Sequence, residues 1–256
     1  MRPTGKIARV AVMVALAAVT AAGCGGDDEP TATSTQIPEA VQNQLSAVAG
    51  VGADSTIVTA SGNSVSVYPA PSAPGGAAAA PKLQLANPNA SGAPLVFLVT
   101  AKMPGWWQVL LPVQPNGSTG WIKAEQVTAS VTPFRIVVSR GEHTLTVYKS
   151  GAPIAVEKVA IGTTDTPTPG GRFYLAELLK PPNPNGPYGA YAFGLNGFST
   201  TLDSFNGREP VIGIHGTNQP QLLGQDVSSG CIRLSNDAVT RLAGTVPTGT
   251  PVDIIA

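Results

Sequence analysis

The chain has 256 residues and carries 15 Lys and Arg against 15 Asp and Glu, so its formal net charge is zero. Without a basic excess or stripe, charge-driven recruitment of nucleic acid is excluded. Charged residues make up only 12% of the chain, beside 24 prolines and 29 glycines, which favours short strands joined by turns over long amphipathic helices.

The N-terminus has the features of an export signal. Three basic residues precede the apolar run Val10–Ala22, which is too short for the roughly 20 residues that span a bilayer. The pattern is typical of a secretory signal peptide over residues 1–23. Small residues then lead into Cys24 as in a bacterial lipobox, although leucine is more usual at the position of Ala21. We expect cleavage before Cys24 and lipidation of its thiol; the alternative is an ordinary signal peptide followed by a coincidental cysteine.

Residues 24–54 are polar and contain proline without an apolar period, which predicts a flexible tether. No second long apolar run follows, so the rest of the chain is expected to be soluble. A lipidated protein of this kind would be extracytoplasmic, held at the outer face of the cytoplasmic membrane.

Residues 55–130 contain short β-branched or aromatic runs separated by Gly, Pro and Asn, a pattern that predicts five strands and a small β-barrel. The stretch "PSAPGGAAAAPKLQLANPNASG" between two of them is a long loop or a decorated hairpin. The ending "GWWQVLLPVQPNGSTGWIKAEQV" resembles bacterial SH3-like cell-wall modules. Trp106, Trp107 and Trp121 would line a ligand groove or, as we favour for at least two of them, pack in the core.

Residues 133–256 are predicted to be mainly β, with one short helix. Three strands follow Phe134, with turns at Gly141 and Gly151. His143 is expected on the solvated face of the second strand, without a chemical role. A long Pro/Gly/Asn-rich loop precedes the strand "PVIGIHG", and loops of this length often shape binding sites. A helix capped by Ser235 or Asn236 is predicted to run to Ala243, before a last strand, "GTPVDII".

The chain has only two cysteines and two histidines. If Cys24 carries lipid, Cys231 is the only free thiol of the mature protein, and an unpaired cysteine in an oxidising compartment suggests a chemical role. His215 stands sixteen residues earlier (231 − 215), at the end of a predicted strand. A histidine within hydrogen-bond reach makes cysteine a good nucleophile.

The residues next to Cys231 fit the same chemistry. Gly230 lets the backbone turn tightly, so that amides near the thiol point at an oxyanion. Arg233 shares a face with Cys231 if the segment is extended, where it would bind a substrate carboxylate or brace the loop. Neither the cysteines nor the histidines are spaced as metal ligands, and we expect no metal and no cofactor.

The sequence from His215 to Asn236 closely resembles the active-site signature of the YkuD-like L,D-transpeptidase catalytic domain. The matching residues are His215-Gly216-Thr217, Gly224, Ser228-Ser229-Gly230-Cys231-Ile232-Arg233-Leu234 and Asn236. Upstream, "TPTPGGRFYL" resembles the family's Thr-Pro-x-Gly-x-Phe strand entry. At Ser229 many members have histidine, a departure that bears on contacts around the site more than on the class. The resemblance covers about Phe134–Ala256 and implies a β-sandwich catalytic domain.

The resemblance implies cross-linking of peptidoglycan stem peptides. Cys231 would attack the carbonyl of the third residue of a donor tetrapeptide and expel the terminal D-alanine, and an acceptor amine would then form a 3→3 bridge. His215 would act as the base, oriented by the carbonyl of Gly216. Ser228 would be a supporting hydrogen-bonding residue, and Gly230 would supply an oxyanion amide. Substrate contacts are expected from Arg233, Thr217, Ser229 and Tyr191.

Other functions stay open at this point. An L,D-carboxypeptidase would use the same acyl-enzyme with water in place of the amine. A non-catalytic wall-binding lipoprotein would be expected to have lost Cys231, His215 or Arg233, and all three are present. A papain-like peptidase needs a histidine after its cysteine, and none follows Cys231. The expected partners are stem peptides and, through the lipid, the membrane; we expect a monomer.

Overall fold

The structure is a computed structural model that describes residues 54–72 and 79–256. The expected signal peptide, the lipidation site Cys24 and all of the tether except Asp54 lie outside the described residues. Within the described part of the chain, no helix is long and apolar enough to cross a membrane.

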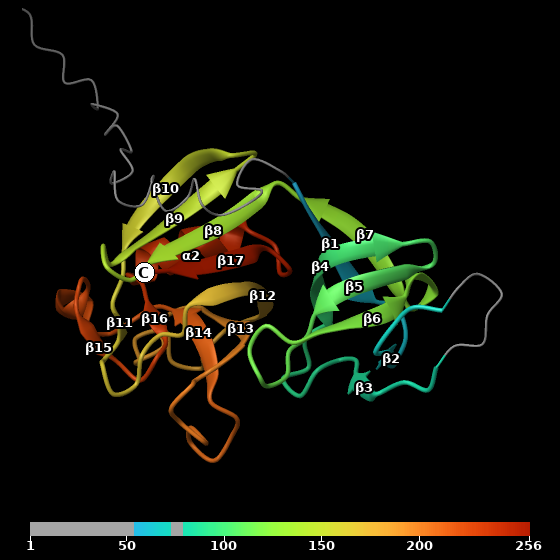
Figure 1. Ribbon diagram of the computed structural model, residues 1–256. Coiled ribbons are helices and arrows are strands. Elements are labelled where there is room, and N and C mark those ends of the chain that lie inside the picture. Colours follow the sequence, from blue (N-terminus) through green and yellow to red (C-terminus); the bar gives the residue numbers. More distant parts are fainter. Residues whose placement is uncertain (1–53, 73–78) are drawn as a thin grey trace, which may run out of the picture. The chain divides into compact units, whose positions relative to one another are not determined.

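The first sheet of the described residues is antiparallel, with the strand order β6-β5-β4-β1-β7 (Figure 1). Its strands are β1 (Ser55–Ala60), β4 (Val96–Met103), β5 (Trp106–Leu110), β6 (Thr119–Lys123) and β7 (Val127–Thr132), with the short 3-10 helix η1 (Ala124–Gln126) before β7. Alternate residues of β6 are buried, as expected for a strand with one face on a core. The boundary predicted at residue 130 falls inside β7.

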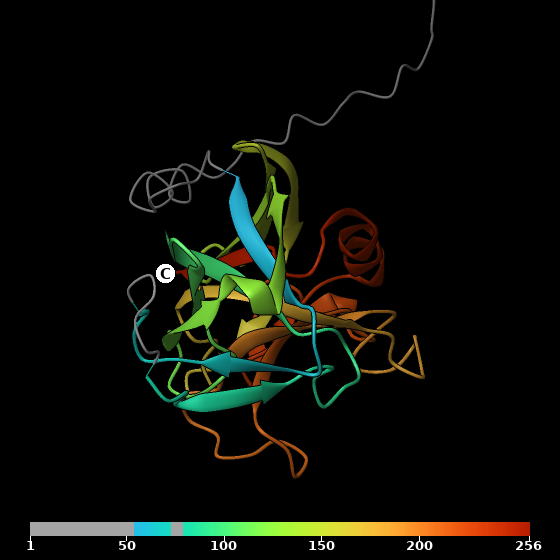
Figure 2. The same ribbon diagram turned by 90° about the vertical axis from the view of Figure 1, so that its right-hand side faces the viewer.

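The long stretch that follows β2 (Ser64–Val67) contributes the second strand of a hairpin, while its residues 73–78 lie outside the described part of the chain. β2 pairs antiparallel with β3 (Leu83–Ala86), and Figure 2 shows these two strands, cyan and teal, side by side. A bridge between Tyr68 and Trp121 joins the hairpin to β6. β3 was part of an undecided segment in the sequence because its four residues are too few to show a clear alternation.

The three tryptophans serve packing to different degrees. Trp106 is buried and meets the Tyr68 ring edge-on, with 5.1 Å between the ring centroids. Trp107 is half-buried and packs against the apolar cluster of this sheet, while the Lys102 ammonium lies 4.9 Å from its centroid. Trp121 is also half-buried. The core interpretation therefore holds for Trp106 and in part for Trp107.

The C-terminal half of the chain builds a mixed sheet with the order β10-β9-β8-β17-β12-β13-β14-β16. Its strands are β8 (Phe134–Ser139), β9 (Thr144–Lys149), β10 (Ala152–Lys158), β12 (Gly171–Leu179), β13 (Ala192–Phe198), β14 (Val211–His215), β16 (Ile232–Arg233) and β17 (Pro251–Ile255). A separate parallel pair joins β11 (Ile161–Gly162) to β15 (Asp226–Ser228), and the 3-10 helix η2 (Pro220–Leu222) precedes β15.

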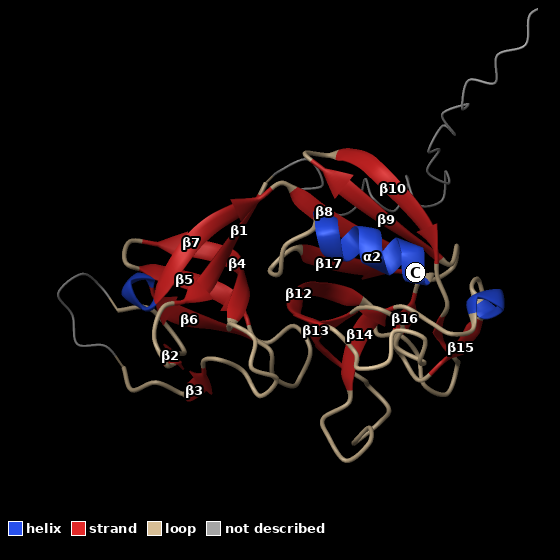
Figure 3. Cartoon of the chain, turned by 180° about the vertical axis from the view of Figure 1, so that it is seen from behind, coloured by secondary structure: helices blue, strands red, loops and turns tan. Residues whose placement is uncertain are grey.

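The helix α2 (Asn236–Thr245) is the α-helix of the described residues, and Figure 3 shows it in blue beside the strands of the large sheet. Ser235 is its N-cap, because the Ser235 Oγ accepts a hydrogen bond from the Ala238 N–H at 3.1 Å. The buried residues Ala238, Val239 and Leu242 join the core of the sheet. The helix ends two residues later than predicted, before Pro247, which disfavours a helical conformation at Val246. For the described residues, the prediction of a mainly β structure with one short α-helix is confirmed.

A third apolar cluster lies between the two sheets. It consists of Ile57, Val96, Leu98, Leu110 and Tyr174. The Asn116 side chain adds two hydrogen bonds to the backbone of Phe198, donating to its carbonyl at 2.8 Å and accepting from its N–H at 2.9 Å. Both sheets belong to one compact unit, so the large sheet is supported on this side by the smaller one.

Candidate active site

His215 is the last residue of β14, and strand pairing brings it to the Cys231 segment. β14 runs parallel to β16 with His215 opposite Arg233. In the same register, Cys231 falls opposite Gly213, and a Cβ placed on Gly213 would lie 4.0 Å from the Cys231 Sγ. The parallel pair therefore turns a separation of sixteen residues in sequence into adjacent positions on neighbouring strands.

The environment of His215 determines its tautomer and its charge. The ring is buried, with 5% of the residue exposed, and Nδ1 donates to the Gly216 carbonyl oxygen at 2.6 Å. A carbonyl oxygen can only accept, so the proton of the neutral ring is on Nδ1 and Nε2 is the basic nitrogen. Burial lowers the pKa of His215 from 6.5 to about 4; the hydrogen bond to Gly216 opposes this shift, and the Arg233 charge adds to it.

Cys231 is a free, half-buried cysteine. Burial raises the pKa of its thiol, while a hydrogen bond from the Gly213 backbone and the positive charge of Arg233 act in the opposite direction. Because the imidazole pKa is lowered and the thiol pKa is raised, the proton stays on sulfur at neutral pH. The arrangement is a neutral thiol beside a neutral base, which suits proton removal during attack on an electrophile.

A cavity of about 310 Å³ opens beside these two residues. Ser228, Ser229 and Arg233 provide polar lining. The apolar and aromatic lining consists of Pro187, Tyr188, Leu202, Phe205, Pro210, Val211 and Ile212. Among the described lining residues, Arg233 is the only one with a permanent charge. The cavity thus offers one cation on a largely apolar wall, which fits an extended ligand with a carboxylate.

Arg233 is held by its backbone and keeps donor capacity in its side chain. Its N–H donates to the Ala160 carbonyl at 2.8 Å, and its carbonyl accepts from the Ala160 N–H at 3.0 Å. The Nε atom is buried and has no hydrogen-bond partner in the described part of the chain. Both predicted roles of Arg233, binding a substrate carboxylate and bracing the loop, stay predictions.

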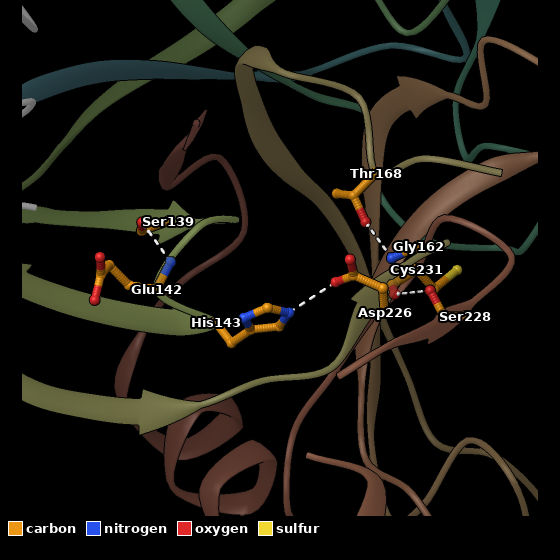
Figure 4. Close-up of polar contacts among 8 residues, drawn as sticks. All are labelled: Ser139, Glu142, His143, Gly162, Thr168, Asp226, Ser228 and Cys231. Atoms are coloured by element: carbon orange, nitrogen blue, oxygen red, sulfur yellow. Dashed lines mark hydrogen bonds and ion pairs between the residues drawn. The ribbon is translucent and has the colours of Figure 1, made fainter. Parts of the chain in front are cut away.

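Ser228 holds the segment Ser228–Cys231 together through hydrogen bonds, as Figure 4 shows for its contact with Cys231. The Ser228 Oγ donates to the Cys231 carbonyl at 2.6 Å and accepts from the Gly230 N–H at 3.1 Å. The N–H of Gly230, one of the amides predicted to stabilise an oxyanion, is thus engaged with Ser228 in this structure. The Cys231 N–H donates to no acceptor among the described residues and is the better candidate for that role.

Two predicted substrate contacts lie away from the cavity. Thr217 is buried, with 4% of the residue exposed; its N–H donates to Asn236 Oδ1 at 3.1 Å, and its hydroxyl accepts from the Gln219 N–H at 3.0 Å. Tyr191 packs on the core of the large sheet. Neither side chain is among the lining residues of the cavity, and the substrate contacts of Thr217 and Tyr191 stay predictions. Ser229 is exposed and lines the cavity, and its substrate contact stays a prediction.

Sequence reasoning missed Tyr188, which is three residues before the tyrosine that was chosen. Its ring meets the His215 ring edge-on, with 4.9 Å between the centroids, and lines the cavity. Burial raises the pKa of Tyr188, and so does the nearby Cys231. The Pro/Gly-rich loop before β13 was a signal that this segment shapes a site, but it did not distinguish between its two tyrosines.

His143 is not on the solvated face of a strand, as the sequence suggested. It lies in the turn before β9 with φ +50°, and its Nε2 is 2.7 Å from Oδ1 of Asp226, the first residue of β15 (Figure 4). The turn interrupts the strand alternation on which the prediction relied. Within residues 54–72 and 79–256, no group of three or more His, Cys, Asp or Glu side chains is placed to hold a metal ion.

The chain is similar in sequence to known proteins. The profile of the YkuD L,D-transpeptidase catalytic domain matches residues 133–254. A Bacillus licheniformis protein provisionally named L,D-transpeptidase YkuD is 36% identical over 154 residues, covering 57% of this chain and 85% of the relative. A Bacillus subtilis protein with the same provisional name is 39% identical over 122 residues, covering 48% and 66%.

Solved structures include an L,D-transpeptidase from Mycobacterium smegmatis, with a TM-score of 0.41 and 16% identity over 64% of this chain and 90% of that one. The relationship itself rests on the sequence matches, since the Bacillus licheniformis relative is covered over most of its length. The chain therefore belongs to the YkuD family of L,D-transpeptidases.

Proposed function

We propose that the protein is a peptidoglycan L,D-transpeptidase that forms 3→3 cross-links through a cysteine acyl-enzyme. The observation that carries the proposal is the β14–β16 pairing, which sets His215 and Cys231 on one cavity with the basic Nε2 of the imidazole unprotonated. Membership of the YkuD family and the names of the relatives support the same reaction class.

In the first step, the Cys231 sulfur attacks the carbonyl carbon of the third residue of a donor tetrapeptide, while His215 Nε2 takes the thiol proton. A C–S bond forms and the carbonyl π electrons move to oxygen. The Cys231 N–H donates to this oxyanion. Collapse of the intermediate breaks the C–N bond to the terminal D-alanine, whose nitrogen takes the proton from His215. The products are a thioester and free D-alanine.

In the second step, the side-chain amine of an acceptor diamino acid attacks the thioester, and His215 accepts a proton from that amine. The new C–N bond forms, the C–S bond breaks, and the departing sulfur recovers the proton. Arg233 holds a carboxylate of the stem peptide in the cavity during both steps. Water in place of the amine would make the protein an L,D-carboxypeptidase.

A muropeptide assay tests the proposal. Purified disaccharide-tetrapeptide is incubated with the mature protein, and the products are separated and their molecular masses are measured. Dimers with a 3→3 bridge together with free D-alanine are expected. Tripeptide and D-alanine without dimers would identify a carboxypeptidase. No product, together with no carbapenem adduct in the intact mass, would identify a non-catalytic wall-binding protein.

We extend the proposal to the flanking parts of the chain. Residues 1–23 form a signal peptide, Cys24 carries the lipid and residues 24–54 form a tether, which puts the protein at the outer face of the cytoplasmic membrane. Residues 55–130 form an SH3-like module that spaces the catalytic domain or binds the wall. The catalytic domain comprises residues 133–256 and works as a monomer. The basic and apolar N-terminal pattern and the Gly-Trp ending of the module support these assignments.

A further inference from the structure

The turn between β11 and β12 contacts the backbone immediately before Cys231. In this turn Thr168 is buried, with 1% of the residue exposed. Its Oγ1 accepts from the Gly162 N–H at 2.9 Å, a contact drawn in Figure 4, and donates to the Gly230 carbonyl oxygen at 2.8 Å. A threonine hydroxyl has a single proton, so its donor is committed to the Gly230 carbonyl.

The turn presents this hydroxyl from a rigid position. Pro167 and Pro169 flank Thr168 and restrict the backbone on both sides. The Arg140 Nη1 donates to the Thr168 carbonyl at 3.2 Å. The turn also packs closely on Gly162, where a Cβ would lie 2.2 Å from the Thr166 carbonyl oxygen. Movement of the hydroxyl away from Gly230 would therefore require several contacts to change together.

A second carbonyl of the segment Ser228–Cys231 is bound from the same turn. The Thr166 Oγ1 donates to the Ser228 carbonyl oxygen at 3.1 Å, and the Thr163 N–H donates to the same oxygen at 3.1 Å. The turn thus binds the carbonyls of Ser228 and Gly230, on either side of the exposed Ser229. Their sequence separation from the turn, 62 residues for each threonine contact, makes this a purely tertiary arrangement.

The Thr168 contact has a direct consequence for Cys231. The Gly230 carbonyl and the Cys231 N–H belong to one planar trans peptide, so they point in opposite directions. By binding the carbonyl, Thr168 determines the direction of the N–H. This constraint matters because Gly230 has φ +112°, a region that glycine enters but in which it is not confined.

We propose that Thr168 is a positioning residue that aims the Cys231 N–H at the oxyanion of the acylation step, with Thr166 supporting the same segment. The inference rests on the proposed function, because it assigns the origin of the oxyanion donor in that reaction. Removal of the Thr168 hydroxyl should let the Gly230–Cys231 peptide rotate, which weakens oxyanion stabilisation while the thiol and its base remain in place.

Three variants and two reagents test the proposal. Thr168→Val removes the hydroxyl at nearly constant volume, and Thr168→Ser keeps it. Thr250→Val is the matched control, because Thr250 is fully buried and its hydroxyl has no hydrogen-bond partner in the described part of the chain. Carbapenem acylation passes through an oxyanion. Alkylation by iodoacetamide displaces iodide from carbon and forms none.

Thr168→Val is expected to slow carbapenem acylation about tenfold or more, with an alkylation rate and alkylation pH profile within about twofold of wild type. Thr168→Ser and Thr250→Val should match wild type with both reagents. If Thr168→Val does not fold, Thr166→Val is measured in its place, and it should also slow acylation selectively.

The inference is overturned if the ratio of acylation rate to alkylation rate stays unchanged in the valine variant, or if Thr168→Ser loses as much acylation as Thr168→Val. A wild-type protein that forms neither carbapenem adduct nor muropeptide product would refute the proposed function itself. An active wild type with an unchanged ratio in the variants would refute only the role of Thr168.

Discussion

Acidification from pH 7.5 to pH 5.0 should destabilise the protein through His215. Burial holds the pKa of this residue at about 4 in the folded chain, whereas a histidine in an unfolded chain has a pKa of about 6.5. The folded pKa is the lower of the two, so the stabilising contribution is complete above pH 6.5. It is lost as the pH falls toward 4, because the unfolded chain binds the proton first.

The size of the loss follows from the two pKa values. A pH of 5.0 is about 1.5 units below the pKa of the histidine in the unfolded chain, so that histidine is protonated. The histidine in the folded chain is still mostly neutral at this pH. At roughly 1.4 kcal/mol per unit, the free energy of unfolding falls by about 2 kcal/mol between pH 7.5 and pH 5.0. A folded pKa one unit lower would hardly change this figure, because the unfolded chain alone determines it once the folded ring stays neutral.

Urea unfolding at the two pH values measures the effect, in a Cys24→Ala background that avoids the expected lipid. His215→Gln is the matched variant, since glutamine does not titrate and the remaining groups are shared. Wild type should lose about 2 kcal/mol more than this variant. Equal losses would show that His215 takes up a proton as readily in the folded chain as in the unfolded chain, and the lowered pKa of the buried imidazole would then be wrong.

Three further predictions concern the nucleophile, the base and the anchor. Cys231→Ser should fold normally but lose cross-linking and carbapenem adducts by at least about a thousandfold; a serine variant that still transfers would remove Cys231 as the nucleophile. His215→Ala should be nearly inactive at pH 7 and recover acylation only above about pH 8.5, since burial raises the Cys231 pKa; a pH profile parallel to wild type would count against His215 as the base. Cys24→Ala should release the protein or leave its precursor uncleaved, without changing the activity of the purified chain; fractionation decides this, and wild-type protein free in the medium without a mass increment on Cys24 would contradict the anchor.

Short-range sequence patterns were sufficient to predict most of the helices and strands. The β-branched runs after Phe134 form the three strands that the glycine turns predicted. Ser235 caps α2 because its side chain and the Ala238 N–H are only three residues apart. Local sequence patterns did not predict the short strands β3, β11, β15 and β16, which have two to four residues each. Such segments become strands only because a partner strand lies beside them.

The candidate site, too, could be predicted from the sequence only in part. The residues around His215 and Cys231 were sufficient to propose a reactive pair from sequence, since the residue types and their order carry the family signature. Only the tertiary structure showed that the Gly230 N–H binds Ser228, that Tyr188 rather than Tyr191 faces the cavity, and that Thr168 binds the Gly230 carbonyl.

The physical reason is the range of the interactions. A cap, a turn or a strand alternation depends on residues a few positions apart, so the sequence displays it directly. A hydrogen bond between segments 62 residues apart depends on which donors and acceptors the packed sheet brings to about 3 Å from each other. Threonine, serine and glycine at these positions could form hydrogen bonds with many different partners. The packing of β11, β14 and β16 determines which partners they have.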